Sequence, residues 1–153
     1  MLFRSITKGG NVPATILCNM LGVRGEALKV SLRDDDQGPE SNLWMAEDAF
    51  GYIPLEEQET CRWDLHKRKN ILIVDDINDT GATFNWIKQD WQSSCLPSED
   101  HAWDAVWENN VHFAVLTENL SSTFDGVRYS VHEVNKAEED VWLVYPWENV
   151  GEY

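Results

Sequence analysis

The residues best suited to chemistry lie in one short stretch, Ile71–Thr83, which reads ILIVDDINDTGAT. Four apolar residues typical of a buried strand run directly into Asp75 and Asp76. Such carboxylates can accept hydrogen bonds from the hydroxyls of a ribose, or bind a divalent cation, which prefers oxygen ligands. A third acid, Asp79, follows three residues later. The stretch therefore predicts a site for a hydroxylated or metal-associated ligand.

The run Thr80-Gly81-Ala82-Thr83 comes next and is expected to open a helix. Backbone N–H groups in the first turn of a helix have no partner within the helix, and together with the two threonine hydroxyls they can cradle an anion. Gly81 allows the close backbone approach that a phosphate requires. A simpler alternative is that Asp79 or Thr80 only caps the helix. That alternative leaves the paired acids and the rest of the run unexplained, so we interpret the stretch as a sugar-phosphate site.

These residues need a sheet to position them, because the carboxyl ends of parallel strands open onto a shared ligand crevice. Apolar periodicity predicts helices around Pro13 and after Thr83, and a helical turn near Trp103, Val106 and Trp107. The first helix would carry its apolar side chains at Ile16, Leu17, Met20 and Leu21, and the second at Phe84, Ile87 and Trp91. Strands are expected at Phe3–Ile6, Val23–Leu32, Ile71–Val74, Val111–Leu116, Val127–Val131 and Val141–Tyr145. This alternation predicts an α/β fold, a mainly parallel sheet flanked by helices.

Length and composition restrict the class of protein further. The 153 residues suit a single domain over 1–153, with a core at about 1–125 and a C-terminal segment at about 126–153. The net charge of -15 argues against binding of nucleic acid, which depends on Lys and Arg. No apolar run approaches a membrane span, and three scattered cysteines favour a reducing, cytoplasmic location. The acid-rich segment 31–60 is predicted to be a long loop or a weakly paired excursion.

The pattern D-D-x-x-D-T-G-x-T after an apolar strand resembles the PRPP-binding motif of the type I phosphoribosyltransferases. The resemblance implies that Asp75 and Asp76 hold the ribose hydroxyls of PRPP, with Asp76 also near the Mg²⁺ ion that the family uses. It assigns the 5′-phosphate to Thr80, Gly81, Ala82 and Thr83, and it makes Asp79 the catalytic candidate, which would assist proton transfer at the nucleobase.

Two further segments resemble the xanthine-guanine branch of this family. In ITKGGNVPATILCNMLGV, Lys8 and Gly9 stand where that branch binds pyrophosphate. In VWLVYPWE, Trp142 would stack on the base and the backbone of Leu143 would contact its edge, within a reduced C-terminal hood. Segment 31–60 takes the place of the loop that closes over PRPP. Without the resemblance, Lys-Gly-Gly would be an ordinary turn, Trp142 a core residue and 31–60 a solvated loop.

The implied function is transfer of the 5-phosphoribosyl group from PRPP to a nucleobase, expected to be a purine, with release of pyrophosphate, as in nucleotide salvage. Partners would be PRPP, a nucleobase and a second copy of the chain, in a homodimer or homotetramer. The chain departs from the branch in three places. Glu118 and Asn119 stand where a base-binding lysine is usual, Met1 begins almost at the first strand, and SLRDDD replaces the usual Ser-Tyr pair of the loop. A non-catalytic sensor of PRPP or a nucleotide, with the same fold, is the alternative.

Overall fold

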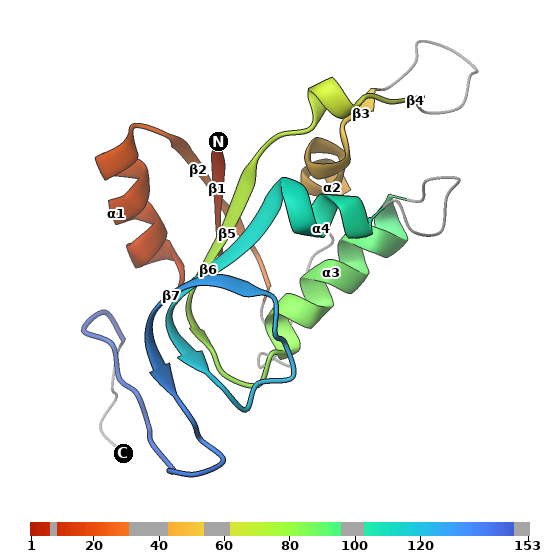
Figure 1. The fold of residues 1–153 in the computed structure, drawn as a ribbon. Helices are drawn as coiled ribbons and strands as arrows, with labels where there is room; N and C mark the ends of the chain where they lie inside the picture. The colour runs from red at the N-terminus through yellow and green to blue at the C-terminus, as the bar shows by residue number, and fades with distance from the viewer. Residues whose placement is uncertain (7–8, 31–42, 54–61, 96–102, 149–153) are drawn as a thin grey trace.

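A computed structural model describes residues 1–6, 9–30, 43–53, 62–95 and 103–148. Five strands form a sheet in the order β2-β1-β5-β6-β7, and every neighbouring pair is parallel (Figure 1). The strands are β1 (Leu2–Ile6), β2 (Arg24–Leu28), β5 (Ile71–Asn78), β6 (Val111–Asn119) and β7 (Val127–Val134). The predicted α/β fold with a parallel sheet is confirmed.

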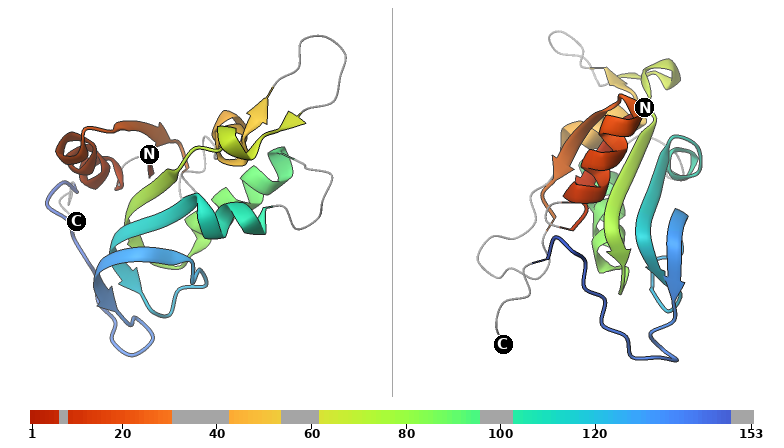
Figure 2. Two further views of the ribbon diagram at one scale, coloured as in Figure 1. Left: turned by 45° about the horizontal axis from the view of Figure 1, so that its top comes forward. Right: turned by 90° about the vertical axis from the view of Figure 1, so that its left-hand side faces the viewer.

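Helices cover the two faces of the sheet unequally (Figures 1 and 2). Helix α1 (Asn11–Leu21) packs on one face, where Ala14 meets Phe3 and Val74. Helices α2 (Leu43–Phe50), α3 (Ala82–Ser94) and α4 (Asp104–Asn109) pack on the other. A short antiparallel pair, β3 (Tyr52–Ile53) and β4 (Arg62–Trp63), and the 3₁₀ turn η1 (Leu65–Lys67) lie beyond α2. No helix within the described ranges is long and apolar enough to cross a bilayer.

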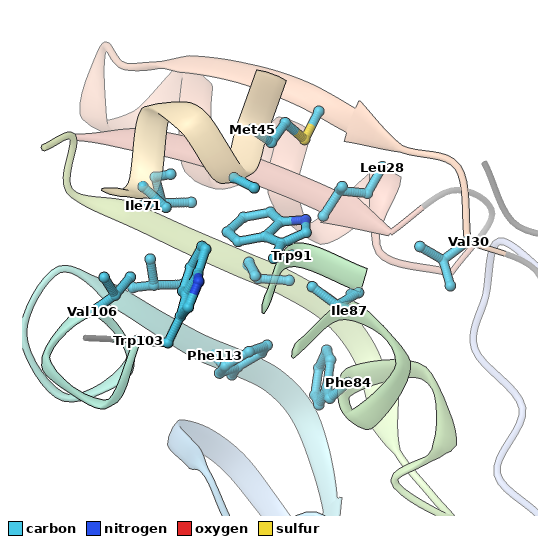
Figure 3. Close-up of a cluster of buried hydrophobic side chains, with 14 of the residues drawn as sticks. Leu28, Val30, Met45, Ile71, Phe84, Ile87, Trp91, Trp103, Val106 and Phe113 are labelled. Atoms are coloured by element: carbon cyan, nitrogen blue, oxygen red, sulfur yellow. The ribbon is translucent and has the colours of Figure 1, made fainter. Parts of the chain in front are cut away.

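The main core fills the space between the sheet and helices α2, α3 and α4 (Figure 3). Phe84, Ile87 and Trp91 line the inner face of α3, as their spacing predicted, and all three are buried. Trp107 stacks between Trp91 and Trp103, at ring-centroid distances of 5.7 and 5.2 Å. Burial of these large aromatic surfaces fixes α3 and α4 against the strands that carry the acidic residues.

Strand β5 continues four residues beyond the predicted end at Val74. The extension is supported by pairing with β6, in which Asp75 faces Val115 and Asn78 faces Glu118. Ladder partners for the backbone allow polar residues to remain in strand conformation. The paired acids therefore lie within the strand and not in the turn after it, so that prediction is wrong in its boundary.

The prediction of a long loop or a weakly paired excursion across 31–60 is wrong at α2, whereas the two-residue pairing of β3 with β4 fits the second alternative. Met45, Ala46, Ala49 and Phe50 form one face of α2 and are buried in the main core. The acids of the segment suggested a solvated loop, but only the opposite face of this short helix needs to meet water. The other positions of the segment, 31–42 and 54–60, lie outside the described residues.

Helix α1 occurs where it was predicted, but its apolar side chains do not form a buried stripe. Ile16, Met20 and Leu21 are 52%, 76% and 60% exposed, and only Leu17 of the four predicted positions packs on the inner cluster. Gly22 ends the helix in the left-handed conformation (φ 63°), as expected of a C-terminal glycine. The outer surface of α1 is therefore unusually apolar.

Candidate active site

Asp75 and Asp76 are both buried near the carboxyl end of β5. The backbone N–H of Asp76 donates to Oδ1 of Asp75 at 2.9 Å, and the N–H of Ile77 donates to Oδ1 of Asp76 at 2.8 Å. Each bond connects a carboxylate to the backbone of the next residue. The two acids are thus held in fixed positions by the strand that carries them.

Burial raises the pKa of Asp76 above its ordinary value, and the nearby Glu148 carboxylate adds to this effect. Hydrogen bonds with the Asp75 side chain and with the N–H of Ile77 partly oppose it. A buried carboxylate of this kind gains most from a ligand that replaces its lost hydration. Ribose hydroxyls or a cation would do so.

Gly9 lies directly against Asp76. A Cβ atom built on Gly9 would come within 2.6 Å of Oδ1 of Asp76, so no other residue fits there without displacing the acid. Two motifs from distant parts of the sequence therefore meet, the predicted pyrophosphate turn and the predicted ribose acids. Lys8, the other residue of that prediction, lies outside the described residues.

The Thr-Gly-Ala-Thr turn leads from β5 into α3. Gly81 precedes the helix with φ 87°, a left-handed conformation that glycine adopts most readily. Oγ1 of Thr80 accepts from the N–H of Ala82 at 3.3 Å, so one of the expected donors already has a partner inside the turn. The hydroxyl of Thr83 and the remaining first-turn amides are the groups left for an anion.

A second turn, Ser121–Phe124, packs against the first. The backbone oxygen of Thr80 accepts from the N–H of Thr123 at 3.0 Å and from its hydroxyl at 2.7 Å. A Cβ atom on Gly81 would meet the nitrogen of Phe124 at 2.6 Å. The conformation of the 80–83 turn is thus set by a segment that was not predicted to belong to the site.

Asn78 joins these two turns and was also missed. Its Nδ2 donates to the backbone oxygen of Phe124 at 3.0 Å, and its Oδ1 accepts from the Ser122 hydroxyl at 3.0 Å. The side chain is 2% exposed. A polar residue next to the acids was visible in the sequence, but its partners come from another loop and could not be seen there.

Asp79 is held by Asn119, the last residue of β6, and by Lys136, two residues after the end of β7. Nδ2 of Asn119 donates to the backbone oxygen of Asp79 at 2.9 Å, and Nζ of Lys136 lies 3.0 Å from its Oδ1. Asn119 was noted in the sequence as a departure, whereas Lys136 was not singled out. A lysine in an otherwise acidic segment, Glu133–Asp140, was the available signal.

The C-terminal segment returns to the site without forming the strand predicted at Val141–Tyr145. The Tyr145 hydroxyl lies 2.7 Å from Oγ1 of Thr117 and 3.1 Å from the backbone oxygen of Asp76, and so anchors the segment beside the acids. Trp142 is 78% exposed, not part of the core, and Leu143 is half-buried. The indole ring lies in solvent, with Nζ of Lys136 over it at 6.0 Å from the ring centroid.

The donor set fits a magnesium ion that is shared with a phosphorylated ligand. Within the described ranges, no group of three or more His, Cys, Asp or Glu side chains could hold a metal by itself. Mg²⁺ commonly keeps several waters and binds through one or two carboxylates plus ligand phosphates. Asp75 and Asp76 supply carboxylates of that kind.

The arrangement can be compared with that of known proteins. No protein-family model matches the sequence. A purine phosphoribosyltransferase from Pyrococcus horikoshii matches with a TM-score of 0.59 and 20% identity, over 99% of this chain and 79% of that one. The chain has the type I phosphoribosyltransferase fold. A hypothetical protein from Neisseria gonorrhoeae with bound ppGpp shares this fold, with a TM-score of 0.51 and 20% identity, over 97% of this chain and 74% of that one.

Within the phosphoribosyltransferase fold, the predicted residues separate into two groups. Asp75, Asp76 and Gly9 lie together near the end of β5, and the 80–83 turn continues from that strand into α3. Trp142 is brought near Asp79 indirectly, through Lys136, whose Nζ lies 6.0 Å from the centroid of the indole ring.

Proposed function

We propose that this protein is a phosphoribosyltransferase that moves the 5-phosphoribosyl group of PRPP to a purine base and releases pyrophosphate. The observation that carries the proposal is the close packing of Gly9 on Asp76, because it brings the predicted pyrophosphate turn to the predicted ribose acids. The shared fold supports the same reading.

Each group of residues has a role in this reaction. Asp75 and Asp76 would accept hydrogen bonds from the ribose hydroxyls, and the 80–83 turn would bind the 5′-phosphate at the start of α3. As the bond from C1 to pyrophosphate breaks, positive charge develops on the ribose ring, and the buried carboxylates would stabilise it. Asp79 would take up the proton that the attacking base nitrogen loses. Mg²⁺, when bound, would neutralise the leaving pyrophosphate.

The base would stack on the exposed ring of Trp142, with the backbone of Leu143 at its edge. Anchoring of the C-terminal segment by Tyr145 supports this placement, because it holds the segment against Thr117 and Asp76.

The direct test is pyrophosphate release from PRPP and Mg²⁺ in the presence of guanine, xanthine, hypoxanthine, adenine or uracil. Release with a purine, lost in Asp79→Asn, is the expected result. Absence of release with every base would contradict the proposal if PRPP still binds.

That second outcome would favour the alternative, a sensor that binds PRPP or a nucleotide without catalysis. A specific observation keeps it under consideration: one protein of the same fold carries bound ppGpp, a nucleotide. The sensor should bind PRPP or a nucleotide in titrations of tryptophan fluorescence and yet show no turnover with any base.

We also propose that the protein pairs with a second copy in a homodimer or homotetramer. An apolar groove of about 760 Å³ between α1 and β7 supports it, together with the exposed Ile16, Met20 and Leu21. Single exposed apolar residues are common on protein surfaces, but a contiguous apolar surface of this kind marks an interaction site. Sedimentation velocity of the wild type and of Met20→Lys would test this proposal, and a monomeric wild type would overturn it.

A further inference from the structure

The second turn, which lies between β6 and β7, holds both ends of the 80–83 turn. Before that turn, Oδ1 of Asn78 accepts from the Ser122 hydroxyl at 3.0 Å. After it, in the first turn of α3, Nδ2 of Asn85 donates to the Thr123 hydroxyl oxygen at 3.2 Å. Two side chains of one short connection therefore bracket the candidate phosphate site.

The middle of the 80–83 turn is held by two donors on one oxygen. The backbone oxygen of Thr80 accepts from the N–H of Thr123 at 3.0 Å and from the hydroxyl of the same residue at 2.7 Å. Thr123 is exposed, so water could satisfy a carbonyl oxygen beside it. Two protein donors on this oxygen do more than satisfy it, because they also fix the direction in which it points.

The direction of the Thr80 oxygen sets the direction of the next N–H group. This oxygen and the N–H of Gly81 belong to one planar trans peptide, in which the two groups point in opposite directions. Because the oxygen points at Thr123, the Gly81 N–H points away from the second turn. No acceptor within the described ranges pairs with this N–H. It is therefore held as a donor on the side of the turn opposite to Thr123.

Glycine makes this peptide easy to turn over, so the turn needs a restraint. Gly81 has φ 87°, and glycine populates positive and negative φ about equally, so the peptide between Thr80 and Gly81 can rotate at little cost. The rotated peptide would present a carbonyl oxygen to an anion in place of an N–H. A Cβ atom built on Gly81 would lie 2.7 Å from Oγ of Ser122 and 2.8 Å from Oγ1 of Thr123. Position 81 therefore cannot carry a side chain that restrains the turn, and the restraint must come from the second turn.

We propose that Thr123 is a positioning residue for the 5′-phosphate. Its two hydrogen bonds hold the peptide between Thr80 and Gly81 in the orientation in which the N–H of Gly81 faces the anion. The proposal rests on the proposed function, which assigns the 5′-phosphate to the 80–83 turn. Thr123 does not touch the ligand in this arrangement and acts only through the peptide. Ser122 supports it by fixing the end of β5 from which the turn starts.

The competing explanation is that the Thr123 bonds serve stability alone, and the chain offers a matched control for it. Thr15 is an exposed residue of α1 whose hydroxyl donates to the backbone oxygen of Asn11 at 2.7 Å. The bond from the Thr123 hydroxyl to Thr80 has the same length and the same chemistry. Thr15→Val and Thr123→Val therefore remove the same kind of bond from exposed positions, but only one of the two bonds holds the 80–83 turn.

The test measures how much the 5′-phosphate contributes to binding. Titrations of tryptophan fluorescence would give the dissociation constants of IMP and inosine, and of AMP and adenosine, because the members of each pair differ only in the phosphate. The two pairs cover a 6-oxopurine and a 6-aminopurine, so the result does not depend on which base the site prefers. The proteins compared are the wild type, Thr123→Val, Thr123→Ser and Thr15→Val, and urea unfolding gives the stability of each.

We expect the wild type to bind the nucleotide roughly a hundredfold more tightly than the nucleoside, because a phosphate receives several charge-assisted hydrogen bonds. Thr123→Val should lower this ratio by roughly tenfold, the effect of one misdirected donor, and should leave nucleoside affinity unchanged. Thr123→Ser retains the hydroxyl and should restore the ratio. Thr15→Val should lose a similar amount of stability and keep the ratio. Ser122→Ala should lower the ratio in the same direction, and it provides the measurement if Thr123→Val does not fold.

Two outcomes would overturn the inference, and they can be told apart. If the wild type binds the nucleotide more tightly than the nucleoside, but Thr123→Val keeps that ratio or Thr15→Val lowers it equally, then Thr123 has only a structural role and the proposed function stands. If the wild type binds neither nucleotide, or binds each no more tightly than its nucleoside, the 80–83 turn does not hold the 5′-phosphate. The proposed function then fails, and the inference fails with it.

Discussion

Gly9 packs so closely on Asp76 that a Cβ atom at position 9 would lie within 2.6 Å of the carboxylate Oδ1. The glycine is separated from the acid by most of the first half of the chain, yet the β1–β5 pairing brings the two together. This contact places a candidate pyrophosphate turn at the candidate ribose acids, and it leads to the first prediction.

Gly9→Ala should reduce PRPP affinity by roughly tenfold or more, because the new methyl group must displace the Asp76 carboxylate or the turn. Gly22→Ala is the matched control: it has φ 63° and open space around it, so it should cost about 1 kcal/mol of stability and leave binding unchanged. Isothermal titration with PRPP and Mg²⁺ measures the PRPP affinity of both variants. Equal affinities for Gly9→Ala and the wild type would show that the contact has no role in binding.

Asp76→Asn should change the pH dependence of the free energy of unfolding and should also weaken PRPP binding. Burial raises the pKa of Asp76, so the folded protein retains a proton that the unfolded chain has lost, and the free energy of unfolding falls as pH rises from the ordinary aspartate pKa through the raised value. The asparagine variant lacks this term, so its stability relative to the wild type should increase with pH over that window. Urea unfolding at several pH values measures the difference.

The wild type should also bind PRPP more tightly as pH rises through the same window, because the ligand needs the ionised carboxylate. Asp76→Asn should bind weakly at every pH. If it binds PRPP as tightly as the wild type, then Asp76 does not hold the ribose or its metal.

Asn119→Ala should lower the free energy of unfolding by about 2–4 kcal/mol, since several buried hydrogen bonds are lost together. The side chain joins Asp79, Lys136 and Ser121. Asn85→Ala is the control, because Asn85 is exposed and makes one side-chain bond, to Thr123. Urea denaturation should rank the two variants clearly, and similar stabilities would mean that the Asn119 bonds contribute little.

Tyr145→Phe should loosen the C-terminal segment, because it removes the hydroxyl that meets Thr117 and Asp76. We expect a loss of about 1–2 kcal/mol in stability and weaker nucleotide binding, with PRPP affinity less affected. Tyr129→Phe is the comparison, since Tyr129 is 54% exposed on β7. Thermal unfolding would measure the loss of stability, and titration with IMP would measure the loss of nucleotide affinity. If Tyr145→Phe has the stability and the IMP affinity of the wild type, the anchor is unimportant.

Arg4→Ala should destabilise the fold by about 3 kcal/mol without touching the site. Arg4 is fully buried in β1, pairs with Glu26 and Asp48, and lies 4.8 Å from the centroid of the Trp44 ring. Burial lowers the pKa of its guanidinium group, and the two acids oppose that effect. Arg24→Ala, at an exposed position of β2, should cost far less in urea denaturation. Comparable losses for both would contradict a buried network.

The sequence alone determined the local chemistry. An apolar strand followed by Asp75, Asp76 and the 80–83 turn is contiguous, so residue type and order predict both the strand–turn–helix and its suitability for a sugar phosphate. The parallel sheet followed from the alternation of elements. The prediction at α2 was wrong because the many acidic residues around it suggested a solvated loop, although one face of this helix is apolar and buried in the core.

Only the tertiary structure decided which distant residues complete the site. Gly9 meets Asp76, and Asn119 links Asp79 to Lys136, through sheet order and register. Pairing of β5 with β6 and of β6 with β7 places the ends of three strands side by side, and a polar residue in one loop then finds its partners in another. Such contacts depend on the whole sheet, and no spacing along the chain encodes them.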